Sequence, residues 1–150
     1  MFTFNEFIKY AAIRECEAKQ GWYISLMNSA TGEVIKRFYA IMAKRKNREI
    51  KKLSRIGENP PLADSRTRRL TVCAVAPEDK LNALSFLPDA LLLARKAEFE
   101  SYLFYMNLAN RTHEGAKQLL FMWIMYLYKS DLLFCEKLLT RISAYSVRHV

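Results

Sequence analysis

The sequence is poor in the residues that usually build a metal, cofactor or disulfide site. It contains three cysteines, Cys16, Cys73 and Cys135, which lie far apart, and two histidines, His113 and His149. No CxxC pair occurs, and neither histidine is close in sequence to a cysteine. Because zinc sites need closely spaced ligands, we expect no metal and no cofactor. Three separated cysteines are typical of reduced, mostly buried thiols in a cytoplasmic protein.

Glycine is also scarce, with four residues in 150. There is no glycine-rich loop to hold a phosphate and no GxSxG elbow to present a nucleophile. His113 is interpreted as a surface residue at a helix start, and His149 lies beside the end of the chain. Glu98 and Glu100 cannot share one face of a helix, because residues two apart point in different directions. The sequence therefore offers no catalytic residue, and enzymatic activity ranks third among the functions considered.

Long hydrophobic runs are absent as well. The longest, Leu119 to Tyr128, has ten residues, whereas about 20 are needed to span a bilayer as a helix. We therefore expect no transmembrane segment and interpret this run as a buried helix. Residues 1–15 lack the basic start and apolar centre of a signal peptide.

The sequence does contain enough hydrophobic residues to form the core of a globular domain. Hydrophobic residues make up 51% of the chain and aromatic residues 13%. A length of 150 residues favours one domain, and we expect a compact, mainly α-helical fold. An alternative division has a basic N-terminal lobe, 1–57, and a helical C-terminal lobe, 77–150, joined by a loop over 57–69 that is rich in proline and polar residues.

One long basic helix is predicted over residues 33–56. Apolar residues recur there in steps of three and four, as on one face of a helix. Thr31 is a suitable N-cap and Gly57 a suitable stop. Nine basic residues and a single acid, Glu49, lie between Lys36 and Arg55.

A minor β ribbon is expected beside the helices. Trp22–Met27 and Leu70–Val75 are short segments rich in aromatic or β-branched residues and would form its two strands. A second possibility pairs Trp22–Met27 with Val34–Ile41 in a hairpin. The extension of the helical periodicity to Leu53 argues against that hairpin, since it exceeds the usual length of a strand. An α+β fold is kept as the alternative to a mainly α fold.

The remaining segments are predicted to be helical. The first helix covers 4–19 and ends at Gly21. Pro77 starts a helix that Pro88 restarts or kinks, and the next segment continues to about residue 107. Thr112 is a suitable N-cap for a last helix over 113–145, with a break considered at 130–131. The last helix carries so many large apolar side chains that it must pack against 90–106 or against a second copy in a homodimer.

The uneven charge is the strongest functional signal. The chain has a net charge of +9, and residues 44–69 alone, with ten basic and three acidic residues, account for +7. Such clustering favours an acidic partner, and nucleic acid is the leading candidate, because cations bind phosphates and release condensed counterions. The residues predicted to contact phosphates are Lys44, Arg45, Lys46, Arg48, Lys51, Lys52, Arg55, Arg66, Arg68 and Arg69.

No sequence-reading motif accompanies these cations. There is no helix-turn-helix signature, zinc-finger spacing or RNA-recognition octamer. Trp22, Tyr23, Phe38 and Tyr39 could offer stacking surfaces for bases, although their apolar neighbours favour the core. The alternative function is a protein-binding adaptor or inhibitor, whose apolar half docks while the basic helix meets an acidic protein. Binding to an anionic membrane surface ranks fourth.

Overall fold

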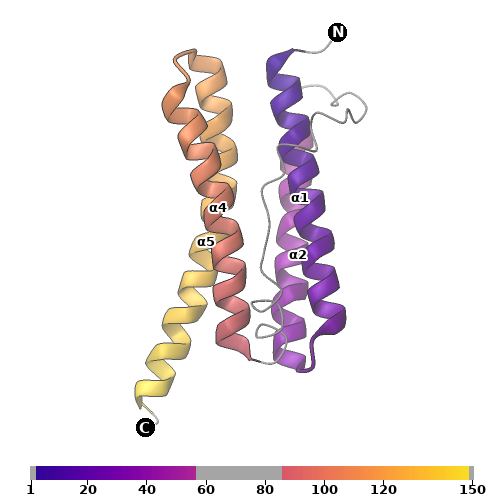
Figure 1. The fold of residues 1–150 in the computed structure, drawn as a ribbon, viewed down its shortest axis with the longest axis vertical. Helices are drawn as coiled ribbons and strands as arrows, with labels where there is room; N and C mark the ends of the chain where they lie inside the picture. Colours follow the sequence, from indigo (N-terminus) through magenta and orange to yellow (C-terminus); the bar gives the residue numbers. More distant parts are fainter. Residues whose placement is uncertain (1–2, 57–85, 149–150) are drawn as a thin grey trace.

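The computed structural model is a bundle of four α-helices (Figure 1). It describes residues 3–56 and 86–148, with side-chain surroundings described up to residue 143. The helices are α1 (Phe4–Ser29), α2 (Glu33–Ser54), α4 (Leu87–Arg111) and α5 (Gly115–Arg148). The mainly helical expectation is confirmed, and no strand occurs among these residues.

The four helices form two antiparallel hairpins that lie side by side. Short turns join α1 to α2 and α4 to α5, whereas the end of α2 and the start of α4 lie at opposite ends of the bundle (Figure 1). As a result α2 runs parallel to α4, and α1 runs parallel to α5. One long connection of this kind is a recognised variant of the four-helix bundle.

Local sequence signals account for two of the helix starts. At α1 the Thr3 hydroxyl accepts a hydrogen bond from the Glu6 amide, and the Glu6 carboxylate accepts one from the Thr3 amide, which makes a capping box. At α4, Pro88 lies in the first turn beside Asp89, where its fixed φ and missing N–H do no harm. Pro88 therefore suits the start of this helix and does not kink it.

The predicted strand at Trp22–Met27 is wrong, because this segment is the last part of α1. The helix passes through Gly21, whose position is open to solvent. A glycine inside a helix costs about 1 kcal/mol. Burial of Leu26, which is fully enclosed, contributes about 1.5–3 kcal/mol and outweighs that cost. Tertiary packing has overridden a local helix-stop signal.

The predicted basic helix is confirmed, with observed bounds Glu33–Ser54. Its N-cap is Gly32, which makes no side-chain hydrogen bond, so the expected cap at Thr31 is wrong. Thr112 likewise ends α4 and does not cap α5. The break considered at Ser130 and Asp131 does not occur, since α5 is continuous there.

The apolar core has two clusters along the length of the bundle. One includes Phe38, Tyr39, Met42 and Leu91, and the other includes Ile13, Leu53, Phe121 and Ile124. The second cluster confirms that α5 hides apolar side chains against other helices of the same chain. Among the described helices, none is apolar enough over a sufficient length to cross a membrane.

Other predictions lie outside the described residues. They are the strand at Leu70–Val75, the helix starting at Pro77, the loop over 57–69, and the cations Arg66, Arg68 and Arg69.

Candidate nucleic-acid interface and the ionic cluster beneath it

A buried ionic cluster joins the two hairpins. Its centre is Lys46 on α2, whose side chain is 0% exposed. The Lys46 ammonium donates to Glu98 Oε2 on α4 at 2.6 Å and to Asp131 Oδ2 on α5 at 2.8 Å. Glu49, one helical turn further along α2, places Oε2 3.2 Å from the same nitrogen. One ammonium group therefore contacts carboxylates from three helices.

A second lysine extends the cluster to α1. Lys19 Nζ donates to the Ser101 hydroxyl at 2.6 Å and to the Ala97 carbonyl at 3.0 Å, and it lies 3.3 Å from Glu98 Oε2. Ser101 in turn donates to Glu15 Oε1 at 2.5 Å. All of these side chains are buried. Buried charges are tolerated only when they are paired in this way.

The charges in this cluster determine one another's protonation. Burial alone would lower the pKa of Lys46, but Glu98, Glu49 and Asp131 raise it well above its usual value. Burial alone would raise the pKa of Asp131, yet the ammonium of Lys46 and the hydrogen bond from Arg45 hold it well below its usual range. Lys46 and Asp131 are therefore charged at neutral pH.

Glu49 behaves differently. Burial raises its pKa well above the usual value, and the nearby carboxylates of Asp131 and Glu98 reinforce the shift against the opposing effect of Lys46. Its Oε2 atom is buried without a hydrogen-bond partner in the described part of the chain. Glu49 is thus the member of the cluster that favours the neutral, protonated form.

The cluster resembles a metal-carboxylate centre in its layout but has lysines inside it. The interior carries one carboxylate from each helix, namely Glu15, Glu49, Glu98 and Asp131. Di-metal bundles use a Glu on two helices and a Glu-x-x-His pair on the other two. In this protein the residue pairs with the same three-residue spacing are Lys46 and Glu49 on α2, and Tyr128 and Asp131 on α5. Neither pair contains a histidine. No group of three or more His, Cys, Asp and Glu side chains in the described chain is placed to hold a metal.

The described cysteines are buried and free. Burial raises the pKa of the Cys135 thiol to about 12, and it raises that of Cys16 well above its usual value. Both thiols are protonated at neutral pH and therefore unreactive. The expectation of buried thiols is confirmed for these two, while Cys73 lies outside the described residues.

The structure separates the predicted phosphate-binding cations of α2 into two sets. Lys46 is enclosed in the ionic cluster, so the prediction that it contacts phosphate is wrong. Arg45 is partly buried, and its guanidinium donates to Asp131 Oδ1 at 2.6 Å and to the Ser130 hydroxyl at 3.0 Å. The exposed set consists of Lys44, Arg48, Lys51, Lys52 and Arg55.

Two members of the exposed set, Arg48 and Lys52, lie beside α5. Together with Arg45, Lys129, Ser130 and Lys137 they make what we call the α2–α5 edge. Two hollows lie on it. One, of about 190 Å³, is lined by Arg48, Lys52 and Glu49 with the adjoining part of α5. The other, of about 460 Å³, is lined by Tyr126, Lys129 and Lys137. Arg45 and Ser130 line both hollows, which are therefore adjacent.

Sequence reasoning missed the contribution of α5 to this edge. Lys129 and Lys137 are 84 and 92 residues from Arg45 in sequence, and only the pairing of Arg45 with Ser130 and Asp131 brings them near it. The aromatic residues considered for stacking, by contrast, belong to the core: Tyr23, Phe38 and Tyr39 are buried, and Trp22 packs against the same cluster.

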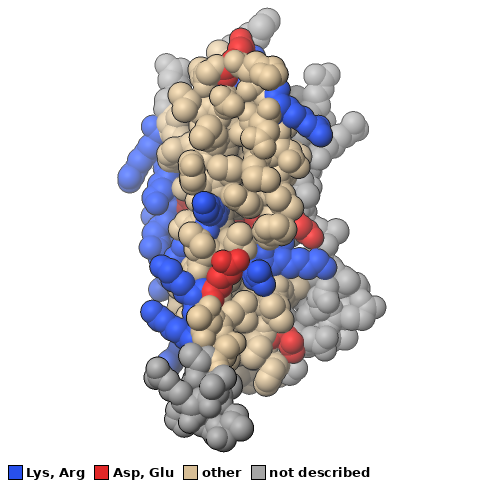
Figure 2. All heavy atoms as spheres, turned by 90° about the vertical axis from the view of Figure 1, so that its left-hand side faces the viewer, with Lys and Arg blue, Asp and Glu red and all other residues tan. Residues whose placement is uncertain are grey.

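Figure 2 shows the face made by α4 and α5, with Lys and Arg side chains gathered along its left edge and few charges across its upper part. The Lys and Arg side chains along that left edge thus lie beside a largely uncharged part of the same face. Exposed apolar side chains on α5 include Leu119, Trp123, Tyr126 and Leu133.

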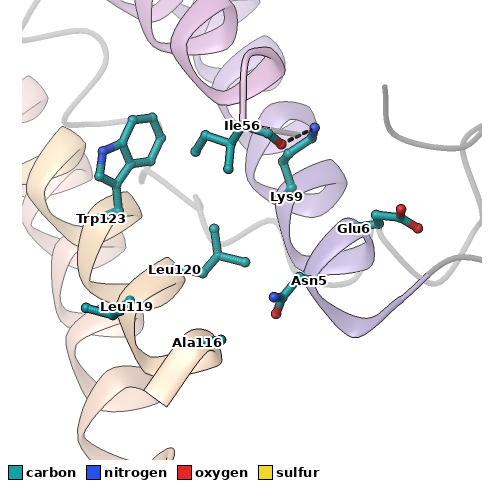
Figure 3. A pocket seen from close by; sticks show the side chains of 8 residues that line it. All are labelled: Asn5, Glu6, Lys9, Ile56, Ala116, Leu119, Leu120 and Trp123. Atoms are coloured by element: carbon teal, nitrogen blue, oxygen red, sulfur yellow. Dashed lines mark hydrogen bonds between the residues drawn. The ribbon is translucent and has the colours of Figure 1, made fainter. Parts of the chain in front are cut away.

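A third hollow, of about 540 Å³, lies at the end of the bundle where α1 and α5 begin (Figure 3). Ile56, Leu120 and Trp123 provide much of its apolar lining. Lys9 reaches across its wall to donate to the Ile56 carbonyl at 2.6 Å. This hollow holds no cluster of free charges and is not continuous with the α2–α5 edge through any shared lining residue.

Fold and site together define a four-helix bundle with an internally neutralised ionic cluster beneath a basic edge. Comparison with models of protein families, with curated proteins and with solved structures found no match.

Proposed function

We propose that this protein binds nucleic acid through the exposed cations of α2 and the adjoining α2–α5 edge, as a small regulatory or accessory protein. The observation that carries the proposal is the division of the cations. Lys46 and Arg45 are neutralised by the protein's own carboxylates, whereas Lys44, Arg48, Lys51, Lys52 and Arg55 form no ion pair among the described residues.

Unpaired cations on one helix face suit a phosphate backbone. Lys44, Arg48, Lys51 and Arg55 recur at steps of three and four, which places them on one side of α2. Each phosphate that they neutralise releases a condensed counterion, so the affinity falls as salt rises. The binding would be independent of sequence, since phosphate contacts position a protein but do not read bases.

Charge reversal with a matched control tests the proposal. The test variant carries Arg48→Glu, Lys51→Glu and Lys52→Glu, and the control carries Arg95→Glu, Lys96→Glu and Arg111→Glu. All six residues are exposed, and both variants change the net charge by the same amount. In electrophoretic mobility or anisotropy titrations at low salt, the test variant should lose binding while the control keeps most of it.

Equal losses in both variants would mean that only net charge matters, and the proposed surface would be wrong. Retention of full binding by the test variant would reject nucleic-acid binding through α2.

The second candidate function is an adaptor or inhibitor that presents the same cations to an acidic protein. The exposed apolar residues of α5 favour it, because protein interfaces combine apolar and charged contacts. Purified protein that carries no nucleic acid, binds none, and forms a stoichiometric complex with one acidic protein would support this alternative. In either case we propose a cytoplasmic binding protein without catalytic activity.

A further inference from the structure

Tyr126 is an exposed aromatic side chain among cations. It lies on α5, is 52% exposed, and lines the 460 Å³ hollow with Lys129 and Lys137. The Lys129 ammonium lies 5.8 Å from the centre of its ring. Most of the other tyrosines described here, such as Tyr23 and Tyr105, are buried. Tyr126 therefore offers a ring to solvent in the larger of the two hollows on the α2–α5 edge.

The hollow around Tyr126 is amphipathic. Leu133 and Phe134 supply apolar lining, and the Arg45 guanidinium stacks over the Phe134 ring at 4.5 Å. Arg45 and Ser130 connect it with the neighbouring hollow, where Arg48 and Lys52 lie. A ligand that covers both hollows would thus meet cations in each of them and an open aromatic ring in one.

The positive charge of this surface favours a nucleic acid over a second copy of the chain as its partner. A second copy related by a twofold axis would place its own Lys129 and Lys137 close to these lysines, and the like charges would repel. A single-stranded nucleic acid supplies both complementary features. Its phosphates match the cations, and its bases are free to stack on an aromatic ring. A duplex keeps its bases stacked inside and cannot use the ring.

We propose that the α2–α5 edge binds single-stranded nucleic acid, with a base stacked on Tyr126 and the flanking phosphates held by Lys129, Lys137, Arg48 and Lys52. This inference rests on the proposed nucleic-acid function and narrows its ligand to the single-stranded form.

The test compares one oligonucleotide of about 16 nucleotides, near the upper site size for single-strand-binding modules, with its duplex. Parent protein should bind the single strand roughly tenfold more tightly than the duplex. Tyr126→Leu keeps an apolar side chain but removes the ring, and it should lower single-strand affinity roughly tenfold, the effect of losing one stacked base. Duplex affinity should stay unchanged. Tyr126→Phe restores a ring and should bind like the parent.

The matched control is Phe99→Leu, which removes an exposed aromatic side chain from α4, away from the edge. It should leave single-strand affinity unchanged. The inference is overturned if Tyr126→Leu binds the single strand like the parent, or if duplex and single strand bind equally well. In either case the proposed nucleic-acid binding would remain, without the preference for a single strand. Absence of binding to both forms would reject the proposed function as well. A dimer of the free protein that Tyr126→Leu dissociates in sedimentation would assign the surface to a second copy.

Discussion

Lys46 Nζ and Glu98 Oε2 lie 2.6 Å apart, although the two residues are 52 positions apart in the chain and belong to different hairpins. Neither side chain is exposed. Their contact, together with that of Lys46 and Asp131, crosses the boundary between the hairpins at the level of the α2–α5 edge. We infer that the ionic cluster fixes the position of α2 relative to α5. It would therefore also fix the arrangement of the cations on the α2–α5 edge.

Removal of Lys46 should be strongly destabilising. Lys46→Met keeps the length of the side chain but leaves Glu98 and Asp131 without their shared cation. Breaking a buried ion pair in this way costs about 3–5 kcal/mol. The control is Lys44→Met on the exposed face of the same helix, where a change within about 0.5 kcal/mol is expected. Denaturant unfolding of the two variants measures the difference, and comparable free energies of unfolding would refute the role given to Lys46.

Glu49 should make the protein less stable as pH rises. Its pKa is raised in the folded state, so between the unfolded value of about 4.3 and the folded value the native state holds a proton that the unfolded state releases. Stability is lost as pH increases through that window. Glu49→Gln removes the titration, so the variant should gain stability relative to the parent as pH rises above the unfolded value of about 4.3.

The measurement for Glu49 is the free energy of unfolding of both proteins at several values of pH. A parent whose advantage over Glu49→Gln grows with pH would show that Glu49 is ionised in the fold. Asp131 acts with the opposite sign, because its depressed pKa gives stability that disappears at lower pH, below about 3.9.

Substitutions of Arg45 and Arg48 should have different effects, the first on stability and the second on nucleic-acid binding. Arg45→Gln removes a partner of the buried Asp131 and should cost about 1–3 kcal/mol of stability. Arg48→Gln touches an exposed, unpaired cation, so it should leave the free energy of unfolding nearly unchanged and weaken binding to a nucleic acid severalfold. Thermal melts and anisotropy titrations on the same two variants check both statements. A loss of stability in Arg48→Gln equal to that in Arg45→Gln would contradict the assignment.

Gly21→Ala should stabilise the protein. Gly21 lies inside α1, and a Cβ placed there would meet no atom within 4 Å apart from its chain neighbours and the backbone of its own helix. Replacement of an exposed helical glycine by alanine contributes about 0.5–1 kcal/mol. A raised denaturation midpoint with increased or unchanged helical circular dichroism is the expected result. Destabilisation would instead favour the break in the helix that the sequence suggested at this glycine.

The helices with strong periodicity could be predicted from the sequence. The basic helix, Glu33–Ser54, has apolar residues on one face and charged residues on the other, and its bounds were predicted within two residues. Trp22–Met27 was misread because its composition suits a strand and a glycine precedes it. Its helical state depends on the packing of Tyr23 and Leu26 in the core, which no local rule reveals.

The burial of the charged residues was even harder to predict from the sequence. Lys44 and Lys46 are two positions apart and look equivalent in the sequence, yet one is exposed and the other is enclosed. The phase of the apolar residues around Met42 and Leu53 places position 46 toward the core, and this was the available signal. Its partners Glu98 and Asp131 come from distant helices, so their pairing could be known only from the fold.

The most direct test of the central claim is the salt dependence of nucleic-acid affinity for the parent protein. If the five exposed cations of α2 and the edge lysines Lys129 and Lys137 each neutralise one phosphate, log affinity should fall against log salt with a slope of about −4.9 for a single strand. The Arg48, Lys51 and Lys52 triple variant should reduce that slope to about −2.8, because four contacts remain. Binding whose affinity does not change with salt, or a triple variant with the slope of the parent, would contradict the claim that these cations hold phosphates.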